Sequence, residues 1–183
     1  MPPLTYADYA ALPDDGRRYE LIDGELVMTP APGYVHQRVL ARLFAILSRH
    51  VRAQKTGEVL FAPLDVILSD ATTVQPDLVY LARDRERQAR KRGIEGPPTL
   101  VIEGLSPTRP EFDLEVKREL YWRHRVPHYW IVDPENRTLE GLVLGTESYA
   151  TEAVFSQEDE ATLSPFPDLV IPLAEIWSLE LPD

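Results

Sequence analysis

Two acidic residues lie in stretches of the sequence that otherwise read as apolar strands. Asp77 precedes "LVYL", and Glu103 interrupts "TLVIEGL". Alternate residues of a strand point to the same face, so each carboxylate shares a face with apolar neighbours. A fold that buries an ionised carboxylate usually pairs it, hydrogen-bonds it or binds it to a metal, because burial without a partner is costly. If the two strands are adjacent, their acids form an all-oxygen site that suits Mg²⁺ or Mn²⁺.

A lysine follows Glu103 at a distance that allows it to return to the same site. After the turn "SPTRP", the chain continues as a charged helix in which Asp113, Lys117 and Tyr121 recur every four residues. These three side chains share one helix face. Only 13 residues separate Glu103 from Lys117, so the helix can fold back against its own strand. Two carboxylates, a divalent ion and an ammonium group are the parts that phosphodiester hydrolysis needs.

The elements that position these residues are expected to form one domain, residues 1–183, of mixed α/β (α+β) class. Its central mixed β-sheet is flanked by the helices of residues 34–55 and 110–124. Two strands meet at the Asp23-Gly24 turn, and the helix of residues 34–55 shows apolar residues at the helical period. Other strands are expected at 57–68, 73–82, 98–105, 128–133, 138–145 and 148–155, the last three antiparallel, with short helices near Thr5 and at the C-terminal end.

The charge of the chain is unevenly distributed. The net charge is −11, but the first 137 residues carry only −1, and the acidic segment from about 138 holds 10 acids and no Lys or Arg. The acidic total therefore does not argue against a nucleic-acid partner for the rest of the surface. One segment, residues 83–92, is basic and could contact phosphates, although such a segment is usually a solvated face. Its cations are Arg83, Arg85, Arg87, Arg90, Lys91 and Arg92.

Composition narrows the remaining classes of protein. The chain has no cysteine, which excludes disulfides and thiolate metal sites, and its four histidines lack zinc-hydrolase spacing. No apolar run reaches the roughly 18 residues of a membrane span, and the N-terminus does not read as a signal peptide. We therefore expect no membrane partner and a cytoplasmic location.

Several blocks of the sequence resemble the Uma-two family of restriction endonucleases, within the PD-(D/E)XK nuclease-like superfamily. The blocks are "RRYELIDGELVMTPAPGYVHQRV", "GEVLFAPLDVIL", "VQPDLVYL" and the stretch from "TLVIEGL" to "NRTLE". The resemblance implies a restriction-endonuclease-like core, a metal-dependent nuclease site with Mg²⁺ or Mn²⁺, and DNA as substrate. Asp77 matches the Asp of the PD motif, Glu103 the acid of the (D/E)XK motif, and Glu20 the upstream acid that completes the metal site.

The sequence departs from the motif at two positions. Leu105 stands where the motif has its lysine, and Lys117 matches the place in the next helix to which the lysine has moved in this branch. Gly104 replaces a residue that is more often aliphatic, and glycine in a strand permits close approach of another group. These departures leave open whether the site is catalytic.

The matched blocks contain further residues that are candidates for accessory roles in the site. Gln37 and Tyr121 are accessory candidates, although His36 and Gln37 also read as an exposed pair in the first helical turn. Asp23 and Glu25 flank Glu20, so the hairpin could present any of these three acids. The structural alternative is that Asp77 and Glu103 pair with arginines, while Lys117 pairs with Asp113 on its own helix.

Three functions remain in competition at the level of sequence. The first is a metal-dependent endonuclease in which Glu20, Asp77 and Glu103 hold the ion and Lys117 assists the reaction. The second is an inactive nuclease-fold protein that binds nucleic acid or protein. The third is a two-carboxylate glycosidase, which gives Lys117 no role. A homodimer or a higher homo-oligomer fits the first function, but no motif specifies one.

Overall fold

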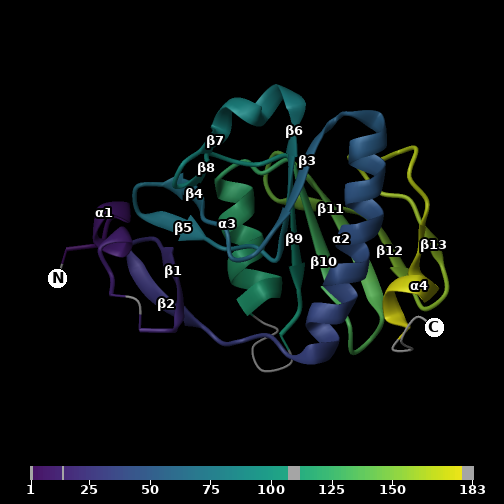
Figure 1. The fold of residues 1–183 in the computed structure, drawn as a ribbon, viewed down its shortest axis with the longest axis horizontal. Helices are drawn as coiled ribbons and strands as arrows, with labels where there is room; N and C mark the ends of the chain where they lie inside the picture. Colours follow the sequence, from purple (N-terminus) through teal and green to yellow (C-terminus); the bar gives the residue numbers. More distant parts are fainter. Residues whose placement is uncertain (1, 14, 107–111, 179–183) are drawn as a thin grey trace.

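A computed structural model describes residues 2–13, 15–106 and 112–178 of the chain (Figure 1). Its central sheet has the strand order β12-β11-β10-β9-β6-β3. The strands are β3 (Gly57–Phe61), β6 (Leu78–Ala82), β9 (Leu100–Gly104), β10 (His128–Asp133), β11 (Thr138–Leu144) and β12 (Tyr149–Ser156). Strands β9 and β10 are parallel, whereas the other neighbours are antiparallel. The predicted mixed sheet, with three antiparallel strands at its C-terminal side, is confirmed.

A second sheet, which the sequence did not predict as a separate layer, has the order β2-β1-β5-β4-β8-β7. Its strands are β1 (Arg18–Ile22), β2 (Glu25–Thr29), β4 (Val66–Ser69), β5 (Thr72–Val74), β7 (Ala89–Arg90) and β8 (Gly93–Glu95). Strands β1 and β2 form the hairpin predicted at Asp23-Gly24. A small pair, β13 (Glu160–Ala161) with β14 (Ile171–Pro172), lies near the C-terminal end.

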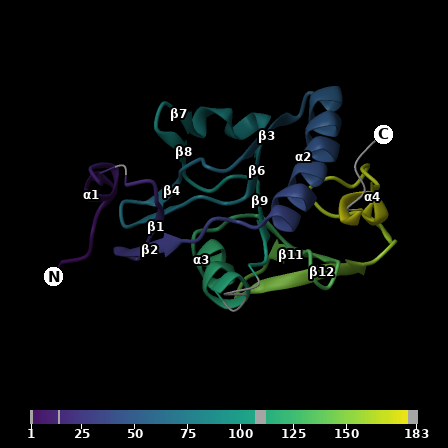
Figure 2. The ribbon, with the colours of Figure 1, turned by 60° about the horizontal axis from the view of Figure 1, so that its bottom comes forward.

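Helices cover both faces of the central sheet. They are α1 (Tyr6–Ala10), α2 (Tyr34–Gln54), the 3₁₀-helix η1 (Arg83–Gln88), the π-helix η2 (Phe112–Lys117), α3 (Arg118–Arg123) and α4 (Leu173–Trp177). Helices α2 and α4 share one hydrophobic core with the sheet, and α3 shares the other with the sheet and the second sheet. Figure 2 shows α2 and α3 on opposite sides of the strands. The predicted start of the second covering helix, at residue 110, lies outside the described residues.

The long helix α2 follows the apolar pattern of its sequence. Val39, Leu43 and Leu47 are at most 1% exposed and pack against the central sheet, as their helical spacing predicts. Val35 belongs to the same pattern but is 42% exposed, because the first turn extends beyond the covered face. The helix ends at Gln54, and Lys55 adopts a left-handed conformation with φ 55°.

Two predicted strands are each divided between the two sheets, so the prediction was wrong there. Residues 57–68 form β3 in the central sheet and β4 in the second sheet, with Pro63 between them. Residues 73–82 likewise contribute to β5 and β6, with Pro76 between them. Proline has no N–H to donate to a ladder, which makes each proline a place where the chain can leave one sheet for the other.

Nowhere in the described ranges is a helix both long and apolar enough to span a membrane.

Candidate active site

Asp77 and Glu103 lie at the same end of two neighbouring strands, with Asp77 directly before β6 and Glu103 within β9. Strands β6 and β9 are antiparallel, with Leu78 opposite Ile102. One step further along this register, Asp77 faces Glu103. The backbone N–H of Gly104 donates to Asp77 Oδ2 over 2.9 Å, which closes the ladder at this end. The two strands are therefore adjacent, and both acids line the same pocket.

Lys117 reaches the same place from the other side of the turn. Its Nζ lies 2.8 Å from Glu103 Oε1 and 3.4 Å from Glu20 Oε1. Tyr121 donates its hydroxyl proton to the same Glu103 Oε1 over 2.5 Å. Both groups project from one face, because Lys117 ends the π-helix and Tyr121 follows four residues later in α3. Lys117, Glu20 and Glu103 are 4%, 2% and 3% exposed, so the ion-pair cluster is almost fully buried.

The β1–β2 hairpin presents Glu20 and not its acidic neighbours. Glu20 Oε1 accepts a hydrogen bond of 2.8 Å from the backbone N–H of Gln75. Its Oε2 is buried and has no hydrogen-bond partner in the described part of the chain. Asp23, by contrast, pairs with Arg123 at 2.7 Å on the surface, and Glu25 is exposed. The three acids are therefore separated by burial, with Glu20 alone turned into the molecule.

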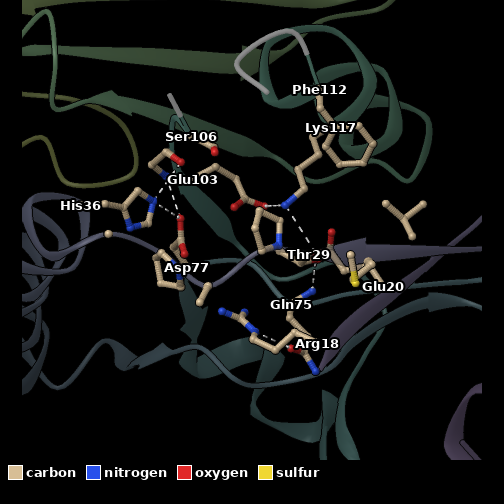
Figure 3. Close-up of a pocket in the computed structure, with 17 residues that line it drawn as sticks. Arg18, Glu20, Thr29, His36, Gln75, Asp77, Glu103, Ser106, Phe112 and Lys117 are labelled. Carbon is tan, nitrogen blue, oxygen red and sulfur yellow. Dashed lines mark hydrogen bonds and ion pairs between the residues drawn. The ribbon is translucent and has the colours of Figure 1, made fainter. Parts of the chain in front are cut away.

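His36 also belongs to this constellation, although its sequence context left it undecided. The imidazole Nε2 lies 3.0 Å from the carbonyl oxygen of Gly104 and 3.2 Å from Asp77 Oδ2 (Figure 3). Gln37, the accessory candidate next to it, is exposed and does not line the pocket. The helical spacing from His36 to Leu40 and Leu43 could have shown which of the pair faces inward.

The charges of His36 and Asp77 stabilise each other. Burial alone would raise the pKa of Asp77, but the hydrogen bond and charge of His36, the Gly104 N–H and the Lys117 charge hold it below its usual value. Burial likewise works to lower the pKa of His36, and the hydrogen bond and charge of Asp77 outweigh it, so this pKa is raised. Complete burial and the nearby Glu103 charge raise the pKa of Tyr121 well above 10, so its phenol stays a proton donor.

These residues line a pocket of about 270 Å³ between the β1–β2 hairpin, the start of α2 and the ends of β6 and β9. Figure 3 shows His36 beside Asp77, and the Lys117 ammonium joined to Glu103 and Glu20. The lining residues are Arg18, Glu20, Val27, Met28, Thr29, Pro30, Ala31, Pro32, Gly33, His36, Gln75, Asp77, Glu103, Gly104, Ser106, Phe112 and Lys117. Tyr121 is not among the lining residues, and it contacts the site through its hydrogen bond to Glu103.

The basic segment 83–92 is not part of the pocket. Helix η1 begins at Arg83, where β6 ends, whereas Asp77 precedes the start of β6. Six residue steps of extended chain, from Asp77 to Arg83, separate the two by about 20 Å. Within the segment, Arg85 donates to the carbonyl of Pro97, and Arg92 pairs with Glu95 at 2.8 Å.

The donor set of the pocket suits a hard divalent ion, although its present arrangement is that of an ion-pair cluster. Among the described residues, no group of three or more His, Asp or Glu side chains is close enough to hold a metal. Instead, the Lys117 ammonium lies between the carboxylates of Glu20 and Glu103. The unpaired Glu20 Oε2 and the oxygen atoms of Asp77 and Glu103 are the ligand types that Mg²⁺ and Mn²⁺ take.

Comparison with known proteins places this fold among nuclease-like α/β proteins. A crystal structure from Anabaena variabilis ATCC 29413, described as a "putative nuclease", matches with a TM-score of 0.78. The match covers 96% of this chain and 98% of that one at 19% identity, a level at which it shows a shared fold. A family model described as "Putative restriction endonuclease", Uma2, matches residues 6–174, and the chain belongs to that family. No match was found among curated proteins.

Proposed function

We propose that this protein is a metal-dependent endonuclease that hydrolyses phosphodiester bonds of DNA. One observation carries the proposal: Glu103 and Asp77 sit side by side at the edge of a pocket, with the Lys117 ammonium 2.8 Å from Glu103. A buried lysine beside carboxylates supplies positive charge where a phosphate would develop negative charge. The family membership of residues 6–174 supports the same class of reaction.

Three acids are proposed to hold Mg²⁺ or Mn²⁺: Glu20, Asp77 and Glu103. When bound, the ion lowers the pKa of a coordinated water and screens the phosphate charge. Each of these three ligands accepts a hydrogen bond from the chain. Gln75 fixes one oxygen of Glu20, and Gly104 fixes one oxygen of Asp77. Tyr121 donates its hydroxyl proton to an oxygen of Glu103, and burial together with the Glu103 charge raises the pKa of this phenol.

Lys117 is proposed to change partners during the reaction. In the described structure its ammonium neutralises Glu20 and Glu103, which would otherwise repel each other in a buried place. With a divalent ion held by Glu20 and Glu103, the Lys117 ammonium would no longer be needed to neutralise them and would be available to the scissile phosphate. The same lysine then stabilises the charge that develops on the phosphate oxygens.

The proposal is tested by incubating the purified chain with plasmid, linear duplex, single-stranded DNA and RNA in Mg²⁺ or Mn²⁺. Asp77→Ala and Lys117→Ala should lose cleavage, whereas Glu58→Gln and Lys55→Met should retain it, because Glu58 and Lys55 are exposed outside the pocket. Equal cleavage by the wild type and both site variants would point to a contaminant. Wild-type protein that binds DNA without cleaving it would favour the inactive binding protein instead.

A further inference from the structure

The contact between His36 and Asp77 depends on the absence of a side chain at residue 104. A Cβ placed on Gly104 would lie 2.5 Å from His36 Nε2 and 2.9 Å from His36 Cδ2, both too close for real atoms. Leu40 Cδ1 would lie 3.2 Å away on the same side. Gly104 is the last residue of β9, where any side chain would collide with the imidazole ring of His36. The absence of a side chain at residue 104 leaves the space that the His36 imidazole occupies.

Asp77 is held from two elements through a single oxygen. Oδ2 accepts from the Gly104 N–H at 2.9 Å and lies 3.2 Å from His36 Nε2. The same Nε2 lies 3.0 Å from the Gly104 carbonyl oxygen, so its proton lies between two acceptors, the Asp77 carboxylate before β6 and the Gly104 carbonyl at the end of β9. In the described ranges no hydrogen bond or ion pair engages Asp77 Oδ1. The carboxylate is thereby oriented with one oxygen left for a ligand.

We propose that His36 is a positioning residue, which orients Asp77 for metal binding, and that Gly104 provides the space this requires. The inference rests on the proposed metal-dependent function and adds two residues to it. His36 acts through Asp77 and is not itself a metal ligand here, since Nε2 faces two oxygen acceptors. Outer groups that orient a metal ligand typically contribute about 10–100-fold to metal affinity.

Direct Mn²⁺ binding to the full chain, measured by calorimetry without DNA, tests the inference. We expect His36→Leu and Gly104→Ala each to weaken Mn²⁺ binding by about 10–100-fold. The double variant should bind no more weakly than either single variant, because both remove the same hydrogen bond. His50→Leu is the matched control, since His50 lies on the same helix about 21 Å away.

A substitute side chain that can still donate a hydrogen bond to Asp77 distinguishes a positioning role of His36 from a role in packing alone. The amide nitrogen of glutamine reaches about as far as Nε2, so His36→Gln should retain binding within about 3-fold of the wild type. His36→Asn, whose amide is too short, should bind as weakly as His36→Leu. This pair also decides the question if His36→Leu does not fold.

The outcomes separate this inference from the proposed function. Wild-type affinity in His36→Leu, His36→Asn and Gly104→Ala overturns the role of His36 and leaves the metal site standing. A lower melting temperature with unchanged Mn²⁺ affinity has the same meaning, because it shows packing alone. A wild-type protein that binds no Mn²⁺ overturns the proposed function together with the inference.

Discussion

The ammonium group of Lys117 lies 2.8 Å from Glu103 Oε1, and both side chains are almost fully buried. The two residues lie on consecutive elements, β9 and the π-helix η2. Because η2 ends at Lys117, the helix repeat changes where the lysine enters the site, and π-helical turns frequently occur at functional sites. An ammonium group therefore reaches Glu103 from the neighbouring helix, while Leu105 occupies the strand position two residues after Glu103.

Replacing Lys117 should separate metal binding from catalysis. In Lys117→Met the two buried glutamates lose their counter-charge, so the metal-free protein should lose about 3–5 kcal/mol of unfolding free energy. The variant should bind Mn²⁺ at least as tightly as the wild type, since no ammonium competes for the carboxylates. DNA cleavage should fall by about 100-fold or more. Urea unfolding of the variant with and without Mn²⁺ measures the changes in stability and in metal binding, and a cleavage assay measures the change in activity. Lys55→Met is the control in both.

A Lys117→Met variant that bound Mn²⁺ more weakly than the wild type would contradict this account. It would mean that the ammonium organises the glutamates for the ion and does not compete with it. Retention of wild-type cleavage would exclude Lys117 from the chemistry.

Tyr121 should stabilise the fold through the charge of its acceptor. Its hydroxyl donates to the Glu103 carboxylate, whereas the hydroxyl of Tyr149, also a buried residue, donates to the neutral carbonyl of Val126 over 2.7 Å. A hydrogen bond to a charged group contributes about 1.5–3 kcal/mol, and a neutral one about 0.5–1.5. Tyr121→Phe should therefore lower the unfolding free energy in urea by more than Tyr149→Phe. Equal losses would show that Glu103 carries no charge in the folded protein.

The chemical residues of the site could be predicted from local sequence, but their packing could not. Asp77 and Glu103 are recognisable because each is an acid on an apolar strand, and Lys117 because a short link returns it to the strand. Glu20 was found only through the family resemblance. Its pairing with Lys117 joins residues almost a hundred positions apart, and the distance between β1 and the π-helix is set by the whole core.

The fold was predicted well where one element follows one pattern, and poorly where an apolar run crosses between sheets. Helix α2 and the strands β10, β11 and β12 carry their own periodicity and turn residues. The run of residues 57–68 contains only Pro63 as a sign that β3 and β4 belong to different sheets. Which sheet a strand joins depends on pairing partners that are distant in the sequence, and an apolar pattern does not identify those partners.

The His36–Asp77 pair should give the stability a dependence on pH with a maximum in mildly acidic solution. The pKa of His36 is raised above 6.5, so its contribution is full below that pH and is lost as pH rises through the folded value. The pKa of Asp77 is lowered below 3.8, so its contribution is present above that pH and is lost on acidification. Together they stabilise most between about pH 4 and 6.5.

The comparison of wild type with His36→Gln measures this dependence, because glutamine keeps the hydrogen bond and never carries charge. The difference in unfolding free energy should be largest near pH 5–6 and shrink toward pH 8. His36 Nδ1 is buried without a hydrogen-bond partner in the described ranges. This burial disfavours the charged imidazolium, in which both ring nitrogens carry a proton. A difference that does not change with pH would show that His36 remains neutral throughout.

DNA binding should depend more on Arg18 than on the basic segment 83–92. Arg18 lines the pocket, where its Nε donates to Gln75 Oε1 over 3.4 Å, and its guanidinium can meet a phosphate entering beside Glu20. In metal-free buffer, Arg18→Gln should weaken binding of a labelled duplex and reduce the slope of log affinity against log salt by about 1. Arg87→Gln, on η1 at the far end of β6, is the matched change and should have a smaller effect. A larger effect of Arg87→Gln would instead place the duplex across the basic segment, away from the carboxylates that are proposed to cleave it.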